Sequence, residues 1–125
     1  MTAYRAVVLE HFRRPRNRSA LPDANREADG ANHLCGDRIR IQLRVEGERI
    51  DEARFSADAC ALCIASASLL TEAVRGMSTD DAKRLDAPWI ARLLGGEPPA
   101  GRMRCAVLPL DTLSRAIGGE VDRPA

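Results

Sequence analysis

Residues 38–45 read RIRIQLRV, in which an apolar side chain at every second position alternates with arginine or glutamine. This period of two is typical of a β-strand with one buried and one solvated face. Residues 46–49 (EGER) then supply a glycine-containing turn, and residues 50–55 supply a partner strand. The clearest element that the chain predicts is therefore an antiparallel hairpin.

The segment before this hairpin predicts a short amphipathic helix. Thr2 is a suitable N-cap, and Pro15 prevents the helix from continuing. The buried face of this helix is made by residues at helical spacing, namely Tyr4, Val7, Val8 and His11. Residues 18–31 show little periodicity and are interpreted as a loop or a weakly marked edge strand.

The segment after the hairpin is helical in character. We expect one helix over residues 61–74 that stops at Gly76, and a short second helix capped by Ser78 or Thr79. We expect a third helix with Pro88 at its first position. A last helix follows Cys105, with Pro109 in its first turn and Gly118-Gly119 at its end. A small sheet followed by about four to five helices predicts an α+β fold, and residues 1–125 are expected to form a single domain.

Composition and charge exclude several classes of protein. Nineteen basic residues nearly balance eighteen acidic ones, so the net charge of +1 offers no field that would recruit nucleic acid or an anionic membrane. No run of eighteen apolar residues is present, and the first residues lack the pattern of a signal peptide. We therefore expect a cytoplasmic protein that binds neither nucleic acid nor membranes.

Four cysteines are the residues most able to support chemistry in this composition: Cys35, Cys60, Cys63 and Cys105. A reducing cytoplasm favours free thiols, metal ligands or transient sulfur chemistry over disulfides. Cys35 precedes a strand, whereas Cys60 and Cys105 are each expected just before a helix. The free N–H groups at a helix start would lower the pKa of both thiols and suit them to be ligands or nucleophiles.

Asp37, two residues after Cys35, could complete a tetrahedral site with three of these thiols. An oxygen ligand binds soft iron or zinc less firmly than a fourth sulfur would, so such a site would release its cargo more readily. Permanent electron carriers usually use four cysteines, and a set of three cysteines and one aspartate fits assembly and handover better. The alternative is that the cysteines are small buried apolar residues.

Four stretches of the chain together resemble the U-type family of iron–sulfur cluster assembly proteins, which comprises IscU, SufU and the N-terminal domain of NifU. These stretches are YRAVVLEHFRRPRNR (4–18), NHLCGDRIRIQLRV (32–45), ARFSADACALCIASASLLTEAVRGMS (53–78) and GRMRCAVLPLDTL (101–113). The resemblance implies a compact α+β fold with a three-stranded sheet and a metal or cluster site at one tip. On this basis, Cys35, Asp37, Cys60 and Cys105 would bind the metal or cluster.

The resemblance also implies a function. The protein would be a scaffold rather than an enzyme, and it would accept persulfide sulfur from a cysteine desulfurase on Cys35 or Cys105. It would assemble a transient [2Fe–2S] cluster and pass it to apo iron–sulfur acceptor proteins, and two copies of the chain could form a homodimer around the cluster. The alternative is a zinc-containing, SufU-type sulfur acceptor that activates the desulfurase.

Two arginines bear on the choice between these branches. IscU-like proteins have a histidine just before the last cysteine and SufU-like proteins have a lysine, whereas this chain has Arg104, which cannot ligate a metal. Arg102 matches an arginine that SufU-like sequences place near the site, where it could hydrogen-bond sulfur; the alternative is a solvated surface arginine. However, the chain lacks the insertion of SufU, and the chaperone motif of IscU is degraded to EPPAGR (97–102).

Three further residues invite a functional interpretation. Cys60 and Cys63 form a C-x-x-C motif, but Cys63 falls on the apolar face of the helix, so we favour a core residue over an auxiliary thiol. His11 is expected to be a structural histidine, and His33 occupies a position where the family has no ligand. The basic run 13–18 is interpreted as a protein-docking or solvated segment rather than a nucleic-acid site.

Overall fold

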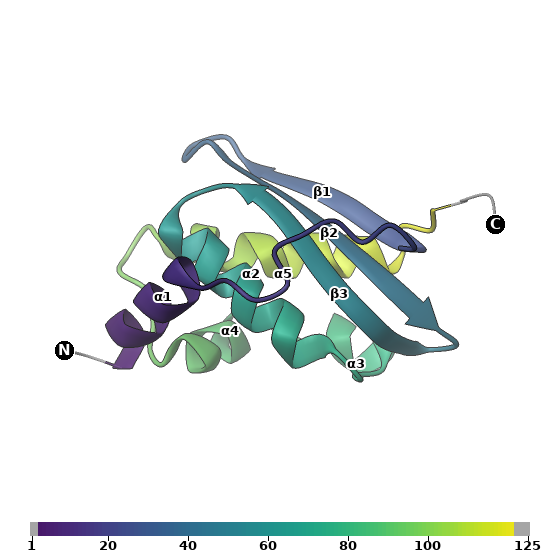
Figure 1. Cartoon of the computed structure of the whole chain (residues 1–125). Coiled ribbons are helices and arrows are strands. Elements are labelled where there is room, and N and C mark those ends of the chain that lie inside the picture. Colours follow the sequence, from purple (N-terminus) through teal and green to yellow (C-terminus); the bar gives the residue numbers. More distant parts are fainter. Residues whose placement is uncertain (1–2, 122–125) are drawn as a thin grey trace.

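The computed structural model describes residues 3–121, which form a three-stranded antiparallel sheet with five helices packed on one face (Figure 1). The strands are β1 (Arg26–Asn32), β2 (Asp37–Glu46) and β3 (Arg49–Asp58), with β2 in the centre. The helices are α1 (Ala3–Arg13), α2 (Ala61–Val74), α3 (Thr79–Lys83), α4 (Ala87–Leu94) and α5 (Met103–Ile117). The predicted α+β fold is confirmed, and the proposed cap Thr2 lies outside the described residues.

The sheet contains the predicted hairpin and one further strand. β2 and β3 pair across a tight turn in which Gly47 has a positive φ of 62°, a conformation that glycine adopts without a steric cost. β3 extends beyond the predicted range of 50–55 at both ends. β1 begins within the segment 18–31, which was interpreted as a loop or a weakly marked edge strand, and it extends to Asn32; it pairs with β2 and lies at the edge of the sheet.

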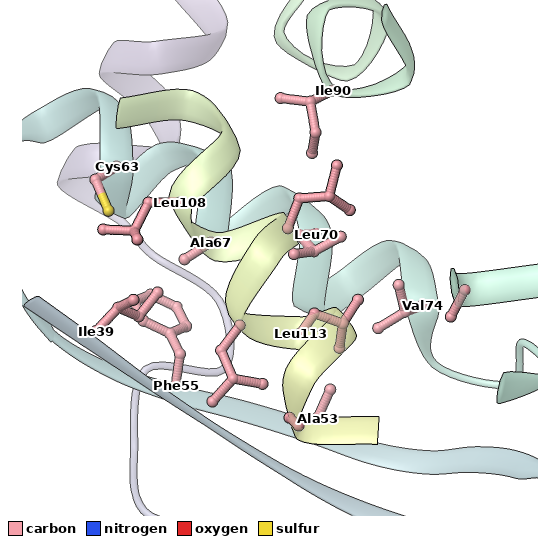
Figure 2. Close-up of a cluster of buried hydrophobic side chains, with 14 of the residues drawn as sticks. Ile39, Ala53, Phe55, Cys63, Ala67, Leu70, Val74, Ile90, Leu108 and Leu113 are labelled. Atoms are coloured by element: carbon pink, nitrogen blue, oxygen red, sulfur yellow. The ribbon is translucent and has the colours of Figure 1, made fainter. Parts of the chain in front are cut away.

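The alternating pattern of β2 separates the two faces of the sheet as predicted. The apolar residues of β2 point into the core, while Arg38 and Arg40 are exposed on the other face. Phe55 of β3 is the largest fully buried side chain, and it packs between the sheet and the helices (Figure 2). The remaining core consists mainly of aliphatic residues, as the low aromatic content requires; those of β2 are Ile39, Ile41, Leu43 and Val45.

Helices α2 and α5 cover the inner face of the sheet, and α1 and α4 pack outside α2 and α5. The small residues of α2 allow this close packing. Ser66 donates a hydrogen bond to the carbonyl of Ala106 in α5, and the Ser68 hydroxyl lies 2.8 Å from Nδ1 of His11 in α1. Within residues 3–121, no helix has the length and apolar character needed to cross a bilayer.

The start of α5 was predicted too late in the sequence. The helix begins at Met103, so Cys105 is its third residue and does not precede it. Pro109 consequently lies inside the helix and not in its first turn. The reason is that Gly101, with a φ of 83°, ends the preceding loop and allows the helix to begin two residues before Cys105. Similarly, α4 begins at Ala87, capped by Asp86, so Pro88 is its second residue.

Gly30 of β1 permits the close approach of α5, and we expect its replacement to destabilise the fold. A Cβ atom at this position would overlap Oγ1 of Thr112, a buried hydroxyl that is held by a 2.8 Å hydrogen bond to the Leu108 carbonyl. Overpacking of this kind typically costs about 1–3 kcal/mol, so Gly30→Ala should lower the free energy of unfolding measured in urea by that amount.

The matched control for Gly30→Ala is the double variant that adds Thr112→Ala, because this change removes the overlapping oxygen. The free energy of unfolding of the double variant should fall by less than the sum of the losses in the two single variants. Full stability of Gly30→Ala alone would contradict the close packing of β1 on α5.

His11 behaves as a structural histidine, and its burial predicts a dependence of stability on pH. Ser68 Oγ accepts the backbone N–H of Arg16 at 2.8 Å, so its own hydrogen is available to Nδ1 of a neutral imidazole. Burial lowers the pKa of His11 below 6.5, and the adjacent Arg16 guanidinium lowers it further. The unfolded state therefore binds the proton more tightly than the folded state does.

The contribution of His11 to the free energy of unfolding should accordingly be complete above pH 7 and should decrease as the pH falls from 6.5 through the lowered pKa of folded His11. Urea unfolding of wild type and His11→Gln at a series of pH values measures this, and the slope should be smaller in the variant. His33→Gln is the control, because His33 is exposed and should leave the slope unchanged. An equal slope in His11→Gln and wild type would disprove the assignment.

Candidate metal and sulfur site

Three segments that are far apart in the sequence meet at one end of the molecule. They are the loop between β1 and β2, the junction between β3 and α2, and the start of α5 (Figure 1, left). Each contributes one cysteine, namely Cys35, Cys60 and Cys105. The β2 strand begins at the same end with Asp37. The structure therefore brings together all four residues that the sequence predicted as ligands.

Cys35 lies in the four-residue loop that connects β1 to β2. Asn32 organises this loop, because its backbone carbonyl accepts the N–H of Cys35 at 3.2 Å and its Oδ1 accepts the N–H of Leu34 at 3.2 Å. Gly36 adopts a φ of 73°, which turns the chain back into β2. The loop leaves the thiol of Cys35 exposed to solvent.

Asp37 is buried, with only 2% of its surface exposed. Its Oδ1 accepts the backbone N–H of Cys60 at 2.8 Å, and its Oδ2 lies 3.7 Å from the Cys60 Sγ. Among the described residues, no arginine, lysine or histidine forms an ion pair with this carboxylate. A buried carboxylate without a cationic partner fits a metal ligand, because a bound cation would compensate for its burial.

The remaining thiols lie close to this carboxylate. The Sγ atoms of Cys35 and Cys105 are 3.6 Å apart, and one ligand atom from each of Cys35, Asp37 and Cys105 lies within 4.8 Å of the others. Cys60 does not belong to this group of three, but its Sγ lies 3.7 Å from Oδ2 of Asp37. The structure thus gathers three sulfurs and one oxygen at one end of the fold, and these are donor types that bind zinc or iron.

A protein-family model described as the NifU-like N terminal domain matches residues 3–122, which is nearly the whole chain. The chain belongs to this family. The match confirms the resemblance inferred from the four motifs.

Proteins named for iron–sulfur cluster assembly and for sulfur transfer are among the relatives of this chain. The chain is 33% identical to the iron–sulfur cluster assembly scaffold protein IscU 1 of Archaeoglobus fulgidus, an alignment that covers 96% of this chain and 82% of the relative. It is 29% identical to the zinc-dependent sulfurtransferase SufU of Bacillus subtilis, over 95% of this chain and 92% of the relative.

The crystal structure of a NifU-like protein (N-terminal) from Brucella abortus has the same fold. It superposes with a TM-score of 0.75 at 22% identity and covers 93% of this chain and 92% of that chain. The three-stranded sheet with packed helices is therefore the fold of NifU-like domains.

The expected lowering of the Cys105 pKa is wrong for this NifU-like chain. Burial raises the pKa of Cys105 to about 12, and the neighbouring thiols Cys35 and Cys60 raise it further. Cys105 is fully buried, so the loss of hydration outweighs the benefit of the helix start, which disfavours the thiolate. A metal ion would reverse this balance, because coordination favours the thiolate.

The two arginines near the end of the motif occupy different environments. Nη2 of Arg102 donates a hydrogen bond to the Cys60 Sγ at 3.6 Å, and the neighbouring thiols Cys60 and Cys105 raise the pKa of Arg102. Arg102 therefore lies at the site. Arg104 is exposed, and none of its contacts reaches a described cysteine.

Cys63 is the thiol that the structure separates from the ligand set. It is fully buried in the core, beside Leu108 of α5 (Figure 2). Burial raises the pKa of Cys63 strongly, and the nearby Asp37 carboxylate adds to the effect. These findings agree with the interpretation of Cys63 as a core residue. His33 is exposed and does not belong to the group of ligand atoms.

Two residues near the site were not identified from the sequence. The pKa of Tyr4 in α1 is raised mainly by burial. The Arg102 guanidinium lowers this pKa and the Cys60 and Cys105 thiols raise it, so Tyr4 borders the site. Asn32 supports the loop that holds Cys35. An asparagine three residues before a thiol and next to a glycine-containing turn is a signal that could have indicated its role.

Proposed function

We propose that this NifU-like protein is an iron–sulfur cluster assembly scaffold in which Cys35, Asp37, Cys60 and Cys105 bind the nascent [2Fe–2S] cluster. The convergence of these four side chains on one end of the fold is the observation that supports the proposal most strongly. The names of its relatives agree, because the protein from Archaeoglobus fulgidus is a cluster assembly scaffold. Asp37 provides the oxygen ligand that would make the cluster easier to release.

Cys35 is the residue that we assign as the persulfide acceptor. Its thiol is exposed, whereas Cys105, the other candidate, is fully buried. The Cys35 thiolate would attack the terminal sulfur of a persulfide on a cysteine desulfurase. The sulfur–sulfur bond of the donor breaks, the donor cysteine leaves as a thiolate, and a persulfide forms on Cys35. Arg102 could stabilise anionic sulfur at the site because its guanidinium already contacts Cys60.

Anaerobic reconstitution with iron, cysteine and a cysteine desulfurase tests the scaffold proposal. Wild type should develop the visible absorbance of an iron–sulfur cluster, and a Cys35→Ala, Cys60→Ala, Cys105→Ala triple variant should not. His33→Ala is the control, since His33 is exposed and is not among the proposed ligands, so this variant should leave the absorbance unchanged. No absorbance in wild type, or equal absorbance in the triple variant, would refute the proposal.

A second candidate function is that of a zinc-dependent sulfur acceptor that activates a desulfurase. The contact between Arg102 and Cys60 favours it, as does the match to the SufU protein of Bacillus subtilis, which is a zinc-dependent sulfurtransferase. The same four residues would bind zinc, whose tetrahedral preference suits three sulfurs and one oxygen. Elemental analysis of freshly purified protein, together with a desulfurase turnover assay, tests this function. A zinc content near zero and an unchanged turnover rate would exclude it.

The proposed function also implies partners. A cysteine desulfurase would supply sulfur, and apo iron–sulfur proteins would accept the completed cluster. We further propose that two copies of the chain could share one cluster and that the protein acts in the cytoplasm. Analytical ultracentrifugation before and after reconstitution would show whether cluster formation produces a dimer.

A further inference from the structure

The two cysteines of the C-x-x-C motif lie at the first turn of α2 with different access to solvent. Cys60 is the N-cap residue, with an extended backbone at φ −68° and ψ 165°, and its side chain is half-buried. Cys63 is the third residue of the helix and has 0% of its surface exposed. A reagent that arrives from solvent therefore reaches Cys60 first and cannot reach Cys63 directly.

We infer that Cys60 and Cys63 are a dithiol pair in which Cys63 acts as a resolving thiol, closing a disulfide onto Cys60 when Cys60 becomes bonded to another sulfur. This inference is independent of the proposed scaffold function, because it concerns two thiols in the metal-free protein.

The spacing of the pair supports this reaction. Residues three apart within a helix have their Cβ atoms about 5–6 Å apart on the same side, and a disulfide needs about 3.5–4.5 Å. By this guide, the two Cβ atoms must approach each other by about 1–2 Å. Cys60 can supply this movement because it is outside the helix proper and its side chain caps no helical N–H group. A bond formed under such strain is easily reduced again.

The Sγ of Cys60 is also available for attack. Its contacts include the Asp37 carboxylate at 3.7 Å, the Arg102 guanidinium at 3.6 Å and the neighbouring Cys105 thiol. These are weak contacts to sulfur that a rotation of the Cys60 side chain can break. Among residues 3–121, no hydrogen bond holds the Cys63 thiol in place.

The reaction proceeds in two thiol–disulfide exchange steps. A small disulfide RSSR reacts with the Cys60 thiol to give the mixed disulfide Cys60–S–S–R and one RSH. The Cys63 sulfur then attacks the Cys60 Sγ, the bond to the RS group breaks, and the expelled RS takes up the proton that Cys63 gives up. In total, two protein thiols are oxidised to one disulfide and RSSR is reduced to two RSH.

The same second step would act on a persulfide at Cys60. Attack by Cys63 would then expel hydrosulfide, and the outer sulfur would gain two electrons from the two thiols. The resulting disulfide withdraws Cys60 from the ligand set until a dithiol reductant restores both thiols. Cys63 would thus be more than a core residue, since it could supply electrons for sulfide release at this position.

Oxidised glutathione and the metal-free full-length chain provide the test. Cys35→Ala and Cys105→Ala are introduced together, because these two thiols are 3.6 Å apart and could form a competing disulfide. This two-thiol protein is compared with the same protein that also carries Cys63→Ala. Trypsin releases residues 55–75 as one peptide that contains both Cys60 and Cys63, so mass spectrometry reads the pair directly.

The two-thiol protein should yield a 55–75 peptide lighter by two hydrogens, with little glutathione attached. The Cys63→Ala protein should instead accumulate glutathione on Cys60, at least about tenfold more than the two-thiol protein. Equal glutathione adducts in the two proteins, or an unreacted Cys60 in both, would overturn the inference.

A measurement on the unmutated chain covers the case in which a variant fails to fold, which circular dichroism would reveal. In wild type treated with oxidised glutathione, an internal link in peptide 55–75 supports the inference. A link only between peptides 27–38 and 105–115, which contain Cys35 and Cys105, contradicts it.

Discussion

Replacing Cys35 by serine is expected to abolish the transfer of sulfur from a cysteine desulfurase to this protein. The reason is chemical, because a serine hydroxyl has nearly the same shape as the thiol but cannot attack the terminal sulfur of a persulfide at neutral pH. The backbone hydrogen bonds of the loop, including the one from the Cys35 N–H to the Asn32 carbonyl, do not involve the side chain and should persist. The fold should therefore remain intact.

Sulfur transfer is measured by incubating metal-free protein with a desulfurase and cysteine and then detecting the added sulfur by mass spectrometry. Peptide 27–38 contains Cys35 as its only cysteine, so the position of the sulfur can be assigned. We expect Cys35→Ser to lose the signal by about tenfold or more. The matched control is Cys105→Ser, which removes a buried thiol of the same site and should retain transfer within about twofold.

The opposite pattern, in which Cys105→Ser loses the sulfur and Cys35→Ser retains it, would show that the buried thiol is the acceptor. Such a result would require the start of α5 to open during transfer, since Cys105 is fully buried.

Phe55→Ala is expected to cause the largest loss of stability among single substitutions in the core. Phe55 is fully buried between the sheet and the helices, and its ring lies beside Ile39 of β2 (Figure 2). Replacing a buried phenylalanine by alanine typically costs about 3–5 kcal/mol, because apolar contacts are lost and a cavity remains. A domain of this size has a total stability of about 5–15 kcal/mol, so the variant should be partly unfolded at moderate urea concentrations.

Urea unfolding monitored by the fluorescence of the single tryptophan, Trp89, measures this loss. Phe12→Ala is the matched control, because Phe12 is 42% exposed on α1 and its replacement should change the stability by less than about 1 kcal/mol. Equal losses in the two variants would contradict the position of Phe55 at the centre of the core.

Much of the fold could be predicted from the sequence because its local patterns agree with its tertiary environment. The alternation in β2 predicts both the strand and its buried face, since one face of the sheet is covered and the other is solvated. The edge strand β1 was harder to identify. Its sequence, READGAN, has little alternation, because Gly30 replaces the apolar residue that would face α5. The closeness of α5, which only the tertiary structure reveals, excludes a larger side chain there.

The sequence predicted which residues form the candidate site, but it did not predict the pKa of the Cys105 thiol correctly. Motif positions identified Cys35, Asp37, Cys60 and Cys105, and the fold brings these residues together. The position of Cys105 at a helix start suggested a lowered pKa, yet burial raises it. Burial depends on what packs over a residue, and the neighbours of Cys105 include Cys35 of the β1–β2 loop, Asp37 of β2 and Cys60 just before α2. Local sequence around Cys105 does not contain this information.

The most direct test of the four-residue site is X-ray absorption spectroscopy of the protein loaded with one equivalent of zinc. We predict a first coordination shell of three sulfurs at about 2.3 Å and one oxygen at about 2.0–2.2 Å. In Asp37→Ala, the three sulfurs should remain while the fourth ligand changes to water. A shell of four sulfurs would show that Cys63 ligates the metal in place of Asp37. A shell with fewer than three sulfurs would show that the three cysteines do not form one site. Either result would contradict the proposed set of three cysteines and one aspartate.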